Sequence, residues 1–357
     1  MNSCSSRTAA VLIAVVLCAA SALAQAADPR PTLTVGTAKA SRGQKATGVI
    51  AVPPGSDAGT NIPVVVVHGA RPGKVLALVA GAHGTEYASI IALEKMIVLL
   101  DPAQLAGTVI IVPLVNVASF EQKIAHLNPV DGKSLNRLYP GNPNGTQSER
   151  VSYAMTREVV EQCDHLIDLH GGDIDESLRP YSYWNVTGNQ RQDQVSREMA
   201  LAFGLDTIII SADRPKDPAA SRYLENTAST RGKPSLTAEA GYAGTVETDD
   251  VNALVAGCLS VMRYLQILPG LPSVIERPVW IERIAPLTSE QTGMFYPLVR
   301  RGTYVEKGML VGYVTDYFGK TLFEARAPEA GIVLYIRAVP SMTKGETITN
   351  IGVVKAQ

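Results

Sequence analysis

From residue 62 onward, apolar residues gather in short continuous runs instead of alternating with polar ones. Runs of this kind are typical of strands buried on both faces, as in parallel sheets. Five of them predict strands, at residues 63–67, 75–80, 109–115, 166–169 and 207–210. A further short strand is predicted at 236–239, and alternating segments within 32–51 indicate edge strands.

Amphipathic stretches of helical length separate several of these runs. They predict helices at residues 88–100, 149–163, 193–203 and 250–268. Because strands and helices alternate, the sequence predicts an α/β layer fold with a mostly parallel sheet flanked by helices.

A change of pattern follows the last predicted helix. Pro269, Gly270 and Pro272 end that helix and predict a domain boundary near residue 270, so that residues 27–270 form the α/β domain. Residues 271–357 show frequent turn signals and no long helical pattern, which predicts a small all-β domain. Its hairpins resemble those of lipoyl and biotinyl carriers. No lysine stands at the expected tip, so a carrier role is not expected.

Length and charge narrow the functional classes. The chain has 357 residues, of which 46% are hydrophobic, and this is enough for a large core and about two domains. Its 32 basic and 33 acidic residues give a net charge of −1 without any basic stripe. Nucleic acid is therefore not expected as a partner.

Residues 1–26 read as a secretory signal peptide. Arg7 precedes an apolar stretch at 9–20, and small residues at Ala22, Ala24 and Ala26 suit a signal peptidase. A membrane anchor is the rival, but roughly 12 apolar residues fall short of the ~20 that span a bilayer. A lipoprotein signal at Cys18 is disfavoured by Leu17 before it. We expect a periplasmic or secreted protein without membrane contact after cleavage.

Removal of this segment leaves two cysteines, Cys163 and Cys258. Both lie in stretches with helical patterning, which favours two buried free thiols over a disulfide. An oxidising periplasm leaves the pairing open.

The first candidate for chemistry is His83 with Glu86, directly after the predicted strand at 75–80. Open α/β sheets place ligand sites at the carboxyl ends of strands. Gly81 and Gly84 give the backbone freedom for a tight turn that brings both side chains to one ion. Alone, this pair is weak support, because such spacing also occurs by chance and at solvated helix starts.

The second candidate is His170, which ends the strand predicted at 166–169 and precedes two glycines. If the two strands are parallel, His170 lies at the same sheet edge as His83 and Glu86. Two imidazoles and one carboxylate that leave a fourth position open are the ligand set of a catalytic zinc. One zinc ion is therefore expected.

Three further residues suggest a reaction. Glu239 ends the strand at 236–239 and is a candidate base that takes a proton from water, although a surface glutamate is the alternative. Arg137 offers a fork of donors for a carboxylate, and Asn136 lies beside it. A helix-capping Asn136 and a surface Arg137 remain open as alternatives. The expected partner is a small acidic substrate.

Together, four ordered motifs resemble the succinylglutamate desuccinylase and aspartoacylase family, a branch of the zinc carboxypeptidase superfamily. The likeness covers about residues 60–350, and its motifs are Gly81-Ala82-His83-Gly84-Thr85-Glu86, Leu135-Asn136-Arg137, Asp168-Leu169-His170-Gly171 and Thr237-Ala238-Glu239-Ala240-Gly241. The resemblance implies that His83, Glu86 and His170 hold zinc, that Asn136 and Arg137 grip a substrate carboxylate, and that Glu239 is the base.

This chain departs from the family upstream of Asn136. Relatives often carry another basic residue there, where this sequence offers Lys123 or His126. We expect His68, His126 and His165 not to bind the metal, with His68 as the main competitor because it also ends an apolar run. Asp168 is interpreted either as a residue that orients His170 or as a structural acid.

The sequence thus predicts a zinc-dependent hydrolase that cleaves an amide bond in a small, carboxylate-bearing N-acyl amino acid. A periplasmic zinc carboxypeptidase or amidase that acts on cell-wall or imported peptides is the close alternative. A non-catalytic binding protein is disfavoured because three ligands and a candidate base are present. Nothing in the sequence predicts the oligomeric state.

Overall fold

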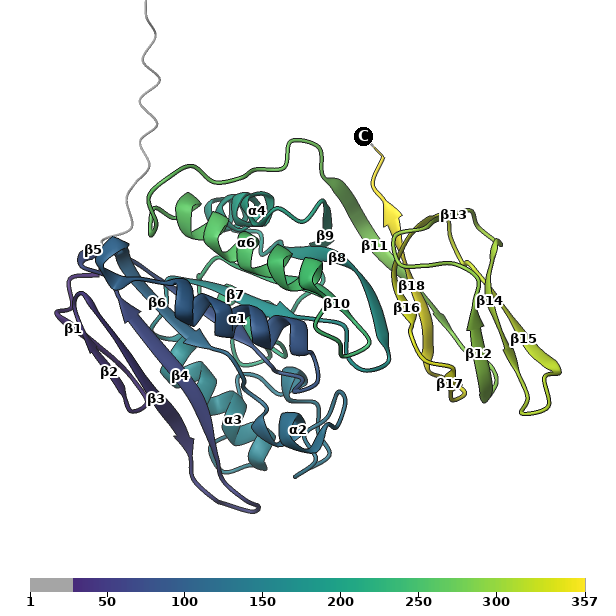
Figure 1. The fold of residues 1–357 in the computed structure, drawn as a ribbon, viewed down its shortest axis with the longest axis horizontal. Helices are drawn as coiled ribbons and strands as arrows, with labels where there is room; N and C mark the ends of the chain where they lie inside the picture. Colours follow the sequence, from purple (N-terminus) through teal and green to yellow (C-terminus); the bar gives the residue numbers. More distant parts are fainter. Residues whose placement is uncertain (1–27, 357) are drawn as a thin grey trace, which may run out of the picture.

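The computed structural model describes residues 28–356, so the signal peptide predicted at 1–26 lies outside the described residues. A long sheet runs through the molecule, with helices on both sides in the first part and strands alone in the last part (Figure 1). Through residue 242 the strands are β1 Thr32–Val35, β2 Ala38–Ser41, β3 Gln44–Val52, β4 Thr60–His68, β5 Arg71–Ala80, β6 Ala106–Val112, β7 His165–His170, β8 Glu176–Asn185, β9 Thr207–Ser211 and β10 Ser235–Tyr242.

The described residues also form six α-helices. They are α1 Tyr87–Leu99, α2 Val117–Gln122, α3 Gln147–Met155, α4 Gln190–Phe203, α5 Leu224–Ser229 and α6 Thr248–Tyr264. The four long helices predicted from the sequence are present, and the second of them, α3, continues as a π-helical turn over Thr156–Val160. The short helices α2 and α5 escaped prediction because six residues carry too little periodicity. Two 3₁₀ turns, Pro102–Gln104 and Leu135–Arg137, complete the helical segments.

The main sheet is mixed, which corrects the prediction of a mostly parallel one. Its strand order is β13-β16-β18-β11-β9-β8-β10-β7-β5-β6-β4-β3. The strands β6, β5, β7 and β10 are parallel neighbours, whereas β4 is antiparallel to β6 and β8 is antiparallel to β10. The run at 63–67 is a strand, as predicted, but it pairs in the opposite direction.

Strand β8 is the main element that the sequence pattern did not predict. It contains Arg179 and Pro180, and its buried positions follow neither strict alternation nor a continuous run. Because β8 enters the sheet between β10 and β9, it reverses the pairing direction there and makes the sheet mixed.

Both faces of the central strands are buried, which explains the continuous apolar runs. In β5, Leu76, Leu78 and Ala80 belong to the core beneath α1, α4 and α6, which lie together over one face (Figure 1). Val75, Ala77 and Val79 face the other core, to which α3 and α5 contribute.

Residues 279–354 contain strands and no helix, as expected for the last part of the chain. The strands are β11 Val279–Thr288, β12 Gly293–Pro297, β13 Tyr304–Val305, β14 Leu310–Thr315, β15 Thr321–Arg326, β16 Gly331–Arg337, β17 Ser341–Met342 and β18 Thr347–Val354. This C-terminal β unit (residues 279–354) has its own apolar core around Phe295. Hydrogen bonding nevertheless continues across the predicted boundary, because β11 pairs with β9 and β16 pairs with β8. The boundary near residue 270 stays a prediction.

Two further observations concern the described residues. Cys163 and Cys258 are both buried and unpaired, as predicted. Among residues 28–356, no helix combines the length and the apolarity that crossing a bilayer requires.

Candidate metal centre

His83 and Glu86 lie in the loop between β5 and α1, at the carboxyl end of a central parallel strand. Gly81 begins this loop with φ of +71°, a conformation that favours glycine. At Gly84 a side chain has no room, because an added Cβ would lie 2.2 Å from the backbone nitrogen of Phe120. The two glycines therefore permit the tight turn that the sequence analysis predicted.

His170 ends β7, which is paired in parallel with β5. Its Nδ1 lies 2.9 Å from one carboxylate oxygen of Glu86, and Nδ1 of His83 lies 2.6 Å from the other. The three residues each offer a ligand atom, and these atoms lie within 4.8 Å of one another. The structure thus brings the predicted ligand set together around one point.

The electrostatics of this cluster favour a cation. Burial alone would raise the pKa of Glu86, but the imidazoles of His83 and His170 lower it below its usual range. Burial alone would lower the pKa of His170, yet Asp168 and Glu86 raise it well above the ordinary value. Carboxylates that hold a positive charge on a buried imidazole create a field that also stabilises a metal cation.

Two residues contact the ring of His170 at Nε2, the nitrogen that does not face Glu86. Asp168 is fully buried, and its carboxylate lies 3.3 Å from Nε2 of His170. The amide nitrogen of Asn136 lies 3.2 Å from the same Nε2, while its oxygen accepts a hydrogen bond from the backbone nitrogen of Leu224. Of the two interpretations of Asp168, this geometry matches the one in which it orients His170.

Arg137 follows Asn136 in a 3₁₀ turn and has an exposed guanidinium group. That group lies over the ring of Tyr223, 4.8 Å from its centroid, and donates a hydrogen bond to the backbone oxygen of Asn136. Tyr223 also stacks against Arg214, at 3.9 Å. The guanidinium of Arg137 is therefore held in place next to Asn136 and Tyr223 while remaining accessible to an anion.

Glu239 stands on β10 opposite His170 of β7 in the parallel register. It is half-buried. Burial raises the pKa of Glu239 well above its ordinary value, and the negative charges of Glu86, Glu176 and Asp168 add to this, whereas His170 opposes it. A carboxyl group with a raised pKa at a cation site is suited to accept and return a proton.

The remaining histidines fall into two groups. His68 contacts the hydroxyl of Thr108 and the backbone oxygen of Arg30, and His165 begins β7 at the end opposite His170. The ring of His126, in contrast, lies 6.2 Å from that of His83. Between the two basic residues considered upstream of Asn136, the structure places His126 at the centre, while Lys123 is exposed at the end of α2.

Sequence reasoning missed the acidic segment that follows His170-Gly171-Gly172. Asp173 is fully buried and accepts hydrogen bonds from the Thr85 hydroxyl and the His126 backbone nitrogen, so it ties both loops of the centre together. Burial, together with the charge of Glu86, raises the pKa of Glu176 to about 7. The density of acidic residues at 173–176 directly after a predicted ligand was the available signal.

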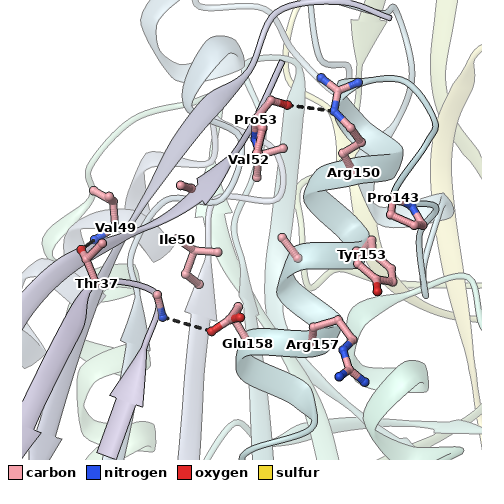
Figure 2. A pocket seen from close by; sticks show the side chains of 13 residues that line it. Thr37, Val49, Ile50, Val52, Pro53, Pro143, Arg150, Tyr153, Arg157 and Glu158 are labelled. Atoms are coloured by element: carbon pink, nitrogen blue, oxygen red, sulfur yellow. Dashed lines mark hydrogen bonds between the residues drawn. The ribbon is translucent and has the colours of Figure 1, made fainter. Parts of the chain in front are cut away.

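A separate cavity of about 490 Å³ lies between β3 and α3 (Figure 2). It is lined mainly by apolar residues such as Ile50 and Val52. At its edge the Glu158 carboxylate accepts a hydrogen bond from the backbone nitrogen of Gly36, and Arg150 donates one to the backbone oxygen of Pro53. None of the predicted site residues lines this cavity.

Comparison with known proteins places this centre in a family. A sequence model of the succinylglutamate desuccinylase/aspartoacylase catalytic domain matches residues 72–265, the segment that carries the described centre. The chain belongs to this family, as its motifs predicted.

Particular relatives agree with this assignment. The N-alpha-acetyl-L-2,4-diaminobutyric acid deacetylase of Halomonas elongata is 28% identical over 299 residues, which cover 82% of this chain and 86% of that protein. The product-bound ectoine utilization protein EutE (DoeB) of Ruegeria pomeroyi superposes with a TM-score of 0.79 at 23% identity, over 90% of this chain and 99% of that one. A succinylglutamate desuccinylase/aspartoacylase of Rhodobacter sphaeroides gives 0.77 at 23% identity, over 88% and 96%. The two structural matches support the fold.

Proposed function

We propose that this protein is a zinc-dependent hydrolase that cleaves the amide bond of a small, carboxylate-bearing N-acyl amino acid. The observation that carries the proposal is the convergence of His83, Glu86 and His170 at one sheet edge, within 4.8 Å, with Glu239 on the neighbouring strand.

The donor set fits zinc. Two imidazole nitrogens and one carboxylate are ligands that this ion prefers in catalytic sites, where a fourth position stays open. The Asp168 carboxylate lies 3.3 Å from Nε2 of His170, in the place where such a ligand usually has a carboxylate neighbour. When bound, zinc lowers the pKa of a water ligand to about 7 and polarises a carbonyl oxygen.

The side chains of this chain would divide the remaining work. Glu239 takes a proton from the attacking water at its carboxylate and returns it to the leaving nitrogen. Arg137 donates to the substrate carboxylate and so orients the scissile amide. His170 is kept in one orientation by Asp168 and Asn136.

The relatives support the reaction class. The Halomonas elongata protein is named a deacetylase of an N-acetylated diamino acid, and the family is named for desuccinylation and for the aspartoacylase reaction. An acyl group on the nitrogen of a small amino acid is common to these names.

A substrate panel tests the proposal. Purified zinc-loaded protein is assayed against N-α-acetyl-2,4-diaminobutyrate, an N-acylaspartate, an N-succinylglutamate and a set of short peptides. Turnover of an acyl amino acid with inert peptides supports the proposal. Turnover of peptides alone would support the carboxypeptidase or amidase alternative, and no turnover of any amide would favour a binding protein.

Glu239→Gln tests the assigned base. We expect kcat to fall by about 100- to 10,000-fold while bound zinc per chain stays unchanged, because the amide cannot accept the proton. Glu94→Gln, at an exposed position of α1, is the matched control and should keep full activity. An active Glu239→Gln enzyme would remove Glu239 from the mechanism.

We also propose that residues 1–26 direct export to the periplasm or the medium. Terminal sequencing of the protein from the periplasmic fraction should begin after Ala24 or Ala26. Full-length protein confined to the cytoplasm would contradict this.

A further inference from the structure

We propose that the C-terminal β unit takes part in the active site: Arg337 of β16, acting through Asp175, holds His126 beside the metal centre. The inference rests on the proposed function and assigns a role to the part of the chain that lies outside the matched catalytic domain. Arg337 is a positioning residue in this account, because it acts through Asp175.

Two hydrogen bonds connect these three residues. Nη1 of Arg337 lies 2.8 Å from one carboxylate oxygen of Asp175, and the other oxygen lies 2.8 Å from Nε2 of His126. The guanidinium is buried, with 7% of Arg337 exposed, and its second contact is Glu346 at 3.4 Å. A buried charge of this kind is costly unless it is paired, so Arg337 constrains Asp175 strongly.

Backbone contacts also connect β16 to the segment that contains Asp175. The backbone nitrogen of Ala338 donates to the backbone oxygen of Asp175, and Arg337 pairs with Glu176 where β16 meets β8. The position of Asp175 is therefore set by the C-terminal β unit as well as by its own loop.

His126 needs such support because its backbone is strained. Its φ of +60° lies in the left-handed region, which residues other than glycine adopt at a cost in free energy. Asp173 accepts a hydrogen bond from its backbone nitrogen, and the same carboxylate oxygen lies 3.2 Å from Nδ1 of the ring. Asp175 contacts the other ring nitrogen, Nε2, so a carboxylate holds the imidazole on each side.

The position of the His126 ring beside the candidate metal centre makes its placement important for the substrate. The ring of His126 is half-exposed and lies edge to face with that of His83, 6.2 Å between centroids. Carboxylates occupy both ring nitrogens, so in this account the imidazole acts as a fixed surface next to the bound substrate, and its placement affects the orientation of the substrate.

A second metal ion is the competing explanation of the same residues. His126, Asp175 and Glu176 each offer a ligand atom, all within 4.8 Å of one another. Arg337 already neutralises Asp175, however, and direct hydrogen bonds at 2.8 Å account for both carboxylate oxygens. The measured zinc content therefore forms part of the test.

The experiment compares four variants of the full zinc-loaded protein: Arg337→Met, Arg337→Lys, His126→Asn and the double variant Arg337→Met/His126→Asn. Arg283→Met is the matched control, because Arg283 belongs to the same β unit and pairs with Glu329 within it. For each protein we measure kcat, KM, zinc per chain and thermal stability, and for Arg337→Met also a crystal structure.

We expect Arg337→Met to lower kcat/KM by about 10- to 100-fold, as expected for misplacement of a substrate contact. Arg337→Lys should retain more activity, since lysine supplies a charge without the fork. Added to His126→Asn, Arg337→Met should have little further effect, and the crystal structure should show the imidazole displaced from His83. Zinc should stay at one ion per chain.

Several results would overturn the inference. One is wild-type kcat/KM in Arg337→Met, and another is an equal loss in the presence and absence of His126, which would indicate a general structural role. A crystal structure of Arg337→Met in which the His126 imidazole has not moved would also overturn the inference. This result does not depend on turnover, so it distinguishes a wrong inference about Arg337 from a wrong proposed function. Two zinc ions per wild-type chain, with one lost in His126→Asn, would favour the second metal site.

Discussion

Strand β7 carries a histidine at each end, and the two are opposite in character. His165 at the amino end is buried, and burial together with the positive charges of Lys74 and Lys233 lowers its pKa to about 3. His170 at the carboxyl end is equally buried, but Asp168 and Glu86 raise its pKa. The two histidines are five positions apart, which separates their Cα atoms by roughly 16 Å along the strand.

Because both rings are buried, the surrounding charges explain why the pKa values of the two imidazoles move in opposite directions. At the carboxyl end the loop after β5 supplies Glu86, and the strands β7 and β10 supply Asp168 and Glu239, so a cation is stabilised. At the amino end lysines stand nearby and the imidazole stays neutral. His165 is therefore an internal control for the role of His170.

The largest effect is expected from His170→Asn. Loss of a ligand should remove most bound zinc and lower kcat/KM by about 1,000-fold or more, because the metal contributes several kcal/mol to the transition state. His165→Asn should keep one zinc per chain and nearly full activity. Metal analysis and steady-state kinetics are measured for both variants. Loss of zinc from His165→Asn but not from His170→Asn would contradict the assignment of the metal to the carboxyl end of β7.

A smaller effect is expected from Asp168→Asn. The amide retains the shape but loses the charge that orients His170 and makes it a stronger ligand, so zinc affinity should fall by about 10- to 100-fold. Competition with a chelator measures the affinity. An unchanged affinity would return Asp168 to the role of a structural acid.

The smallest effect concerns stability in acid. Because the folded-state pKa of His165 lies near 3 and the unfolded value near 6.5, only the unfolded chain gains this proton as the pH falls through that range. The free energy of unfolding should therefore decrease by about 1.4 kcal/mol per pH unit through this group, and stay unaffected by it above pH about 6.5. Denaturant titrations at pH 7, 6 and 5 should show a shallower decrease for His165→Asn, and equal slopes would contradict the assignment.

Much of the centre could be predicted because its candidate ligands stand next to local signals. His83, Glu86 and His170 follow apolar runs and have glycines nearby, so the sequence alone places them at strand ends. Glu239 was predicted to end its strand too, but β10 continues to Tyr242. Their meeting point required parallel pairing of β5, β7 and β10, and that part of the sheet prediction is correct.

What escaped prediction depends on partners far apart in the chain. Strand β8 carries a proline and no regular burial pattern, and it forms because both β10 and β9 offer edges to it. The contact of Asp175 with Arg337 joins residues 162 positions apart, and neither shows a local pattern. Such pairs follow from tertiary packing, and periodicity carries no information about them.

The most direct test of the account is the anomalous scattering of crystals of the zinc-loaded protein, measured on both sides of the zinc edge. The account predicts one strong peak per chain, within about 2.0–2.2 Å of nitrogen atoms of His83 and His170 and an oxygen of Glu86. A fully active protein without a peak at these three residues, or with its peak elsewhere, would contradict it.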